Sequence, residues 1–169
     1  GPGRVRPDPP RDGGVRRGAR ERHQALPRPG EGNLEHAKQQ LDEVRALAMD
    51  LLPVVEAKKA LRGGSFAGVM EEYAEGLLFY WFLKESRLAS MDEAQPVNAT
   101  EYLGGVLDLT GEVGRYAVAR ATKRDVAAVK LCQDIVDRVV GQIMALDSLP
   151  GHIYKKLDAA RGTLRKLEG

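Results

Sequence analysis

Two helical stretches of otherwise apolar character each carry a pair of carboxylates. Glu72 and Glu75 are spaced i, i+3 within EYAEGLLFYWFL, and Asp108 and Glu112 are spaced i, i+4 within EYLGGVLDLTGEVGRY. Both spacings place the two members of a pair on the same face of a helix. Each pair therefore projects from one helix surface, where its oxygens can act together.

These two surfaces are not typical solvated faces. On a helical wheel the first pair shares its face with a glycine and two aromatics, and the second with two glycines and an arginine: Gly68, Phe79 and Phe82, then Gly104, Gly105 and Arg115. Carboxylates that are crowded and partly desolvated are costly unless a cation compensates them. Oxygen ligands alone favour Mg²⁺ or Mn²⁺, ions that activate water and neutralise charge in phosphoryl transfer. Glu72, Glu75, Asp108 and Glu112 are thus candidate metal ligands, and plain solvated helix faces are the alternative.

Arg115 lies close to Asp108 on the same wheel. Its guanidinium could bind a phosphate oxygen through two hydrogen bonds. It could equally form an ion pair within the helix, with Glu112 or with Asp108. Spacing does not separate these two roles.

The composition indicates one domain of ordinary size. A chain of 169 residues can bury a substantial core. The single cysteine, Cys132, excludes an internal disulfide, fits a reducing compartment and is expected to be a small buried residue. The longest apolar run, Leu77–Leu83, is far shorter than a membrane span. We expect a protein of the cytoplasm, and also of the nucleus if the source is eukaryotic, with no membrane partner.

Charge is divided unevenly between two segments. Residues 1–33 hold eight arginines and four acidic residues, six of the nine prolines and no apolar periodicity. This composition predicts a disordered basic tail, which could contact nucleic acid electrostatically or have no role. The remainder, 34–169, is mildly acidic and reads as helical almost throughout.

Helix signals divide residues 34–169 into about five elements, and they predict an all-α antiparallel bundle. Pro53 should kink or interrupt the first helix, and Gly63-Gly64 should end it. Asn98 and Glu101 resemble a capping box. The expected helices run from 34 to 62, from a Ser65 cap to 85 or 86, from 98 to 122, from an Asp125 cap to about 148, and from 153 to 167.

Several familiar sites lack their residues. His23, His36 and His152 are too scattered for a zinc site with Cys132, and each is expected at the surface. The chain contains no Glu-x-x-His pair for a di-iron bundle, no phosphate-binding loop and no dinucleotide fingerprint. Gly104-Gly105, inside a predicted helix, indicates close helix packing rather than a phosphate cradle.

Three motifs resemble the translin-associated factor X branch of the translin family. Glu72-Tyr73-Ala74-Glu75 resembles its E-Y-V-E, and Ser90-Met91-Asp92-Glu93 reproduces its S-M-D-E. The segment from Glu101 to Glu112, followed by Arg115, resembles Y-L-x-G-x-x-D-L-T-G-E-x-x-R. The resemblance covers the chain from about residue 34 to its end.

This resemblance implies an all-α bundle that assembles into octameric barrels on single-stranded RNA or DNA, alone or with translin. It implies a Mg²⁺-dependent endoribonuclease in which Glu72, Glu75 and Asp108 are the catalytic acids and metal ligands and Glu112 is a supporting ligand. Translin itself lacks the acid equivalent to Asp108, so the chain looks like the catalytic branch.

Two other functions are kept as alternatives. One is a non-catalytic translin-like protein that binds single-stranded DNA or RNA, against which Asp108 argues. The other is an all-α nucleoside-triphosphate pyrophosphatase, whose E-E-x-x-E matches Glu71, Glu72 and Glu75. That family requires a second carboxylate pair closer in sequence and with E-x-x-D spacing, whereas here the second pair is Asp108 and Glu112.

Overall fold

The computed structural model describes residues 33–169, and these residues form six helices and no strand. The expected all-α class is confirmed. The segment 1–33 that the sequence predicts as a tail lies outside the described residues, except for Asn33, the first residue of α2. The helices are α2 (Asn33–Ala57), α3 (Lys59–Arg62), α4 (Ser65–Glu85), α5 (Ala99–Thr122), α6 (Val126–Met144) and α7 (Gly151–Glu168).

Local signals set most of the helix ends. Asn98 and Glu101 form the predicted capping box, in which each side chain accepts a hydrogen bond from the other residue's backbone N–H. Asp125 caps α6 by accepting a hydrogen bond from the backbone N–H of Ala128. The predicted Ser65 cap is wrong, because Gly64 is the N-cap residue and Ser65 already lies inside α4.

Pro53 does not end the first helix. The helix α2 continues through it to Ala57, and a break at Lys58 separates α2 from the short α3. A proline removes one backbone hydrogen bond, which a long helix packed along its length can tolerate.

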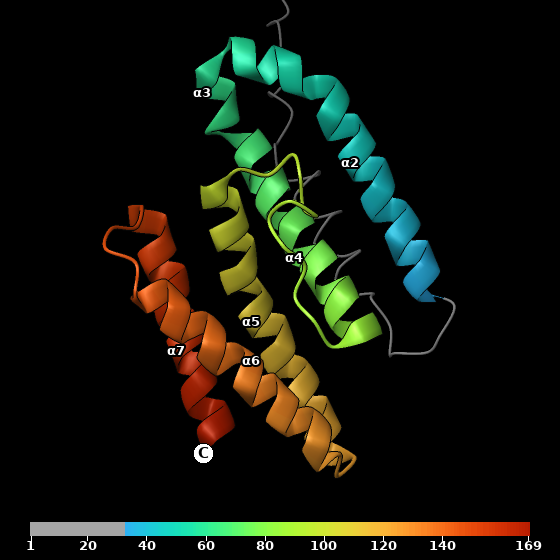
Figure 1. The fold of residues 1–169 in the computed structure, drawn as a ribbon, viewed down its shortest axis with the longest axis vertical. Coiled ribbons are helices and arrows are strands. Elements are labelled where there is room, and N and C mark those ends of the chain that lie inside the picture. The colour runs from blue at the N-terminus through green and yellow to red at the C-terminus, as the bar shows by residue number, and fades with distance from the viewer. Residues whose placement is uncertain (1–32) are drawn as a thin grey trace, which may run out of the picture.

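The order of the helices departs from a simple antiparallel bundle. Helices α4, α5 and α7 run in one direction, and α2 and α6 run in the other (Figure 1). The connection 86–98 makes α4 and α5 parallel, because it returns along the bundle before α5 begins. Two side-chain contacts agree with this order. Arg62, just before the start of α4, donates a hydrogen bond to Glu101 near the start of α5. Phe82, near the end of α4, contacts Tyr116 in the second half of α5.

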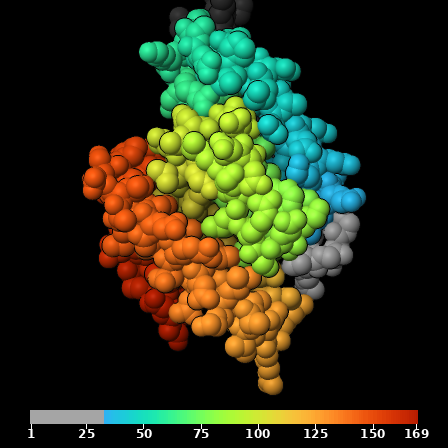
Figure 2. Space-filling view, viewed as in Figure 1, coloured from blue at the N-terminus to red at the C-terminus, as the bar shows by residue number. Residues whose placement is uncertain are grey.

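The core is centred on α4, which packs between α2 and α5, while α6 and α7 cover the other side of α5. The turn between α2 and α3 projects beyond the other helices at one end of the molecule (Figure 2). Within residues 33–169, no helix is long and apolar enough to cross a membrane.

The apolar run Leu77–Leu83 is buried inside this single chain. Six of its seven side chains are buried, and Trp81 is half-buried against the cluster. An apolar run around the whole circumference of a helix can mark either a subunit interface or deep burial within one chain. Here α2 and α5 pack on two sides of α4 and bury the run within the chain.

Candidate functional site

Two glycines on α5 bring this helix unusually close to α4. A Cβ atom on Gly105 would lie 2.6 Å from the Cβ of Ala74 and 2.9 Å from the backbone oxygen of Glu71. A Cβ on Gly104 would lie 2.5 Å from the carboxyl carbon of Glu71. Gly104-Gly105 is thus a close-packing site, as its position inside a helix indicated. The close approach places polar groups of α4 beside Asp108.

Asp108, the predicted catalytic acid of α5, is held by a lysine of α7. Lys156 Nζ donates hydrogen bonds to Asp108 Oδ1 at 2.7 Å and Oδ2 at 2.6 Å. The same ammonium lies 3.5 Å from Oε2 of Glu71 on α4. One cation therefore joins carboxylates from two other helices.

A histidine completes this contact. His152 Nε2 lies 3.2 Å from Oε1 of Glu71, and His152 precedes Lys156 by four residues, one turn of α7. His152 is exposed, as expected, whereas Glu71 is only 14% exposed. We call Glu71, Asp108, His152 and Lys156 the α4–α5–α7 cluster.

The cluster keeps Lys156 charged. Burial by itself would lower the pKa of Lys156, but the hydrogen bond and the negative charge of Asp108, with those of Glu71, outweigh it. The net result is a raised pKa, so the ammonium form predominates at neutral pH. The α4–α5–α7 cluster is therefore an ion-pair network.

Glu72 and Glu75, the other predicted acids, lie on α4 outside this network. Glu72 is half-buried, and Glu75 is buried close to the α4–α5 contact, where its backbone nitrogen lies 3.0 Å from the Cβ position at Gly105. The spacing pointed to Glu72 as the carboxylate beside Glu75, but Glu71 is the neighbour of Asp108 and Lys156. One residue along a helix turns a side chain by about 100°.

Glu112 and Arg115 form an ion pair with each other. The sequence allowed two roles for Arg115, phosphate binding or an ion pair within its helix, and the structure contains the ion pair. The Arg115 side chain is 68% exposed, so its remaining donors face solvent.

The donor atoms suit a hard divalent ion, but their arrangement does not present a site for one. Both oxygens of Asp108 contact Lys156. No group of three or more His, Cys, Asp or Glu side chains in the part of the chain that the structure describes is placed to hold a metal ion. The residue types thus fit Mg²⁺ or Mn²⁺, and the geometry does not.

Two members of the cluster, His152 and Lys156, were not predicted as site residues, and Glu71 was named only in the motif of the pyrophosphatase alternative. A signal existed, because His152 and Lys156 are spaced i, i+4 and flank the buried stripe of α7 formed by Ile153 and Leu157. Nothing local to α7 points to Asp108, which is 48 residues away in sequence.

Comparisons with known proteins agree with this architecture. A model described as the Translin family matches residues 15–169, so the chain belongs to the Translin family. Among curated proteins, no significant match was found.

Three solved structures share the fold. The crystal structure of apo-NeC3PO superposes with a TM-score of 0.78 at 19% identity, over 93% of this chain and 82% of that one. The complex of AfC3PO with duplex RNA gives a TM-score of 0.68 at 22% identity, over 91% and 80%. The crystal structure of AfC3PO gives 0.62 at 21% identity over the same shares. At these identities the likeness concerns the fold.

Proposed function

We propose that this chain is a subunit of an oligomeric translin-family endoribonuclease of the translin-associated factor X type, acting on single-stranded RNA with Mg²⁺ or Mn²⁺. Glu72, Glu75 and Asp108 are its proposed acids, and Glu112 is a supporting ligand. The observation that carries the proposal is the position of Asp108. This acid lies beside the close contact of α4 and α5 with its side chain 31% exposed, so solvent and substrate can reach it.

The polyanionic substrate sets the chemical requirement. Carboxylates repel phosphodiesters, so this acidic surface needs a cation before it can accept RNA. Of the chain's own groups, Arg115 has free donors at the surface and is the proposed phosphate contact, while Glu112 orients it.

The RNA substrate is proposed from the family and from a structural neighbour. That neighbour, AfC3PO, was solved with duplex RNA. The family resemblance of the D-L-T-G-E segment points instead to single strands, and single-stranded DNA is a further ligand to test. Both polymers present the same phosphate backbone to an acidic, cation-dependent surface.

A second candidate function follows from the Lys156 contact. If Lys156 permanently neutralises Asp108, the chain binds single-stranded nucleic acid without cleaving it. This is the non-catalytic alternative, and the short hydrogen bonds from Lys156 to both Asp108 oxygens are the observation in its favour.

Assembly is proposed from an exposed apolar stripe on α2. Leu47, Leu51 and Val54 follow i, i+4, i+7 spacing and are 61%, 45% and 58% exposed. They lie beside the buried stripe that packs on α4, so α2 has apolar side chains on two adjoining faces. A stripe of this kind is typical of a subunit interface. A second copy of this chain or a translin partner would bury it.

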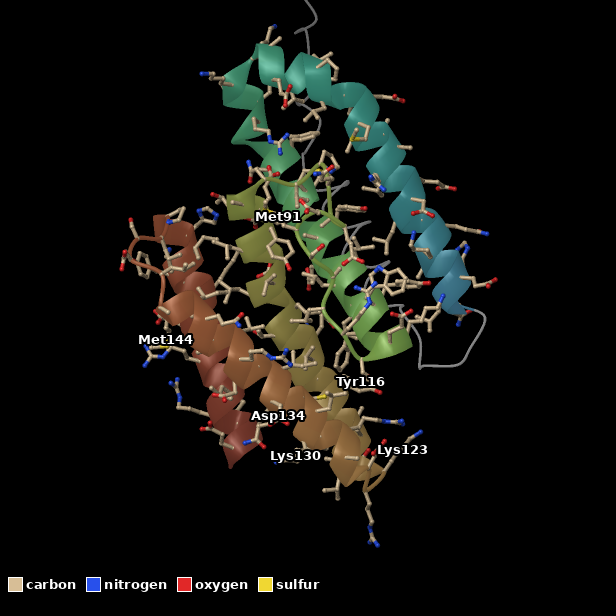
Figure 3. All side chains as sticks on the ribbon, in the orientation of Figure 1. Met91, Tyr116, Lys123, Lys130, Asp134 and Met144 are labelled. Carbon is tan, nitrogen blue, oxygen red and sulfur yellow. The ribbon has the colours of Figure 1, made fainter. Side chains whose placement is uncertain are left out.

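The decisive experiment compares Asp108→Asn with Asp134→Asn. Asp134 is an exposed carboxylate on α6 (Figure 3), so it controls for the loss of one negative charge. Labelled single-stranded RNA is incubated with each variant, with and without Mg²⁺. We expect Asp108→Asn to lower the cleavage rate at least about hundredfold, as loss of one charge-stabilising group does, while RNA binding stays nearly unchanged. Glu72→Gln and Glu75→Gln should behave like Asp108→Asn.

The outcomes separate the candidates. Wild-type cleavage by all three carboxamide variants would show that the site assignment is wrong. Binding without cleavage by the unaltered protein would favour the non-catalytic alternative. A parallel incubation with dNTPs tests the pyrophosphatase, which would release pyrophosphate and leave RNA intact.

A further inference from the structure

The exposed apolar stripe of α2 has a charged residue at each end. Leu47, Leu51 and Val54 form the stripe, and Glu43 lies one helical turn before it. Lys58 follows Val54 by one turn and comes directly after the last residue of α2. Steps of three and four residues keep these positions on one face of the helix. Along the chain, this face therefore carries an acid, three apolar side chains and a base.

Neither of the two charges is compensated inside the chain. Glu43 and Lys58 are both exposed, and neither forms an ion pair with any residue that the structure describes. They lie roughly 22 Å apart along the helix axis, too far to neutralise each other in salt solution. Helix α2 packs on α4 and on the short α3, and it lies at the edge of the bundle (Figure 1). A partner can therefore reach both charges together.

The spacing of these residues suits a second copy of the same helix. Glu43 and Lys58 have the same midpoint along α2 as Leu47 and Val54 have. If two copies of α2 lie antiparallel about that midpoint, each Glu43 faces Lys58 of the other copy and each Leu47 faces Val54. A parallel pair would instead place Glu43 against Glu43 and Lys58 against Lys58, and like charges across an interface oppose binding.

We infer that the exposed stripe of α2 binds the same stripe of a second copy of this chain, with the two helices antiparallel. The pair has two equivalent Glu43–Lys58 ion pairs at its ends and apolar side chains at its centre, as an interface with an apolar core and a polar rim does. The inference rests on the proposed function in taking the stripe as a subunit interface, and it names this chain, rather than a different subunit, as the occupant. It involves neither RNA nor the nuclease acids.

Asp50 opposes this pairing. It is exposed and lies at one edge of the stripe, close to the common midpoint. The two-fold symmetry places Asp50 of both copies on the same side of the pair, where their charges repel. Asp50→Asn should therefore tighten self-association by at least about twofold, and weaker association of this variant would contradict the symmetry.

The test reverses each charge separately. Sedimentation velocity measures the dissociation constant of the 169-residue chain, without RNA or divalent ions. Glu43→Lys and Lys58→Glu should each raise this constant at least about fivefold, because the symmetry turns one substitution into two like-charge contacts. Asp134→Lys is the matched control, since it reverses an exposed carboxylate on α6 (Figure 3) and should associate like the wild type.

Mixing the two variants gives the decisive result. An equimolar mixture of Glu43→Lys and Lys58→Glu should form a mixed pair with a dissociation constant within about twofold of the wild type's, because every lysine then faces a glutamate. Circular dichroism spectra establish that each variant folds. The inference is overturned if the mixture associates no more tightly than its components, if the wild type stays monomeric at micromolar concentration, or if it pairs only with a different subunit.

The proposed function fails by a different readout. Cleavage that survives Asp108→Asn contradicts the nuclease site, whether or not α2 self-associates. Conversely, RNA cleavage by the wild type, together with a mixture that fails to pair, leaves the nuclease in place and removes only this interface.

Discussion

At the scale of single residues, the burial of the Glu101 carboxyl group carries a clear desolvation cost. Its side chain is 2% exposed, and burial raises its pKa despite hydrogen bonds from the backbone of Asn98 and from Arg62. Arg62 donates to Glu101 Oε1 at 2.7 Å and to the backbone oxygen of Pro96 at 3.0 Å. One arginine thus compensates a buried acid and ties the end of α3 to the start of α5.

Arg62→Met should therefore destabilise the protein by about 3 kcal/mol at pH 7, because it leaves a buried carboxylate without its cation. The folded-state pKa of Glu101 is already raised, so the stability that Glu101 contributes is present at low pH and is lost as the pH rises. Removing Arg62 raises this pKa further, and the loss should shrink toward pH 4. Urea unfolding at both pH values measures it.

Two variants control this prediction. Lys130→Met removes an exposed cation of α6 (Figure 3) and should change stability by less than about 0.5 kcal/mol. Adding Glu101→Gln to Arg62→Met should recover part of the loss. Equal losses at pH 7 and pH 4 would contradict the assignment to Glu101.

At the scale of helices, three parallel neighbours determine the geometry of the site. Parallel packing of α4, α5 and α7 brings the first halves of all three helices to one level of the bundle. Small residues make this possible, because Gly105 meets Ala74 and Gly114 meets Thr163 at distances that no Cβ could tolerate. At Gly105, backbone atoms of Glu71 and Glu75 limit how closely α5 approaches α4. At Gly104, the neighbouring atoms belong to the flexible side chain of Glu71, which can move aside.

Gly105→Ala should cost about 3 kcal/mol of unfolding free energy, because its Cβ would overlap Ala74 and backbone atoms that cannot move independently. Gly141→Ala is the matched control, since Gly141 lies inside α6 with open space at its Cβ position. That change should stabilise the protein by up to about 1 kcal/mol through helix propensity. Urea unfolding at one fixed protein concentration compares them, and a Gly105→Ala protein as stable as the wild type would rule out the close contact.

At the scale of the whole molecule, the core is complete, and among the apolar side chains that remain exposed three form a stripe along α2. Cys132 illustrates the core, because it is fully buried and burial raises the pKa of its thiol to about 11. The stripe of Leu47, Leu51 and Val54 has no counterpart in the described chain that covers it. Assembly is therefore expected through α2 rather than through the buried run of α4.

Leu47→Gln combined with Val54→Gln should lower the mass of the assembly in solution, because it replaces two exposed apolar side chains at the proposed interface. Light scattering after size-exclusion chromatography at micromolar concentration measures the mass. Val126→Gln is the control, since Val126 is 76% exposed at the first turn of α6 and away from the stripe. An unchanged mass in the double variant would place the interface elsewhere, and a monomeric wild type would argue against the assembly altogether.

The sequence by itself determined the features that depend on near neighbours in the chain. Apolar periodicity predicted the helices, the capping box at Asn98 and the Asp125 cap predicted two of their starts, and Gly104-Gly105 predicted close packing. The motif around Asp108 predicted the family that the comparisons confirm. Each of these signals lies within one or two helical turns.

Only the tertiary structure decided which groups meet. The parallel order of α4, α5 and α7, the burial of Leu77–Leu83 and the pairing of Asp108 with Lys156 all depend on how helices distant in sequence are rotated and set in register. Helical spacing marks the face of one helix but not the partner of that face, and a rotation of one residue exchanges Glu72 for Glu71. That is why the sequence could indicate acids for a cation, whereas the fold was needed to reveal the lysine that already holds one of them.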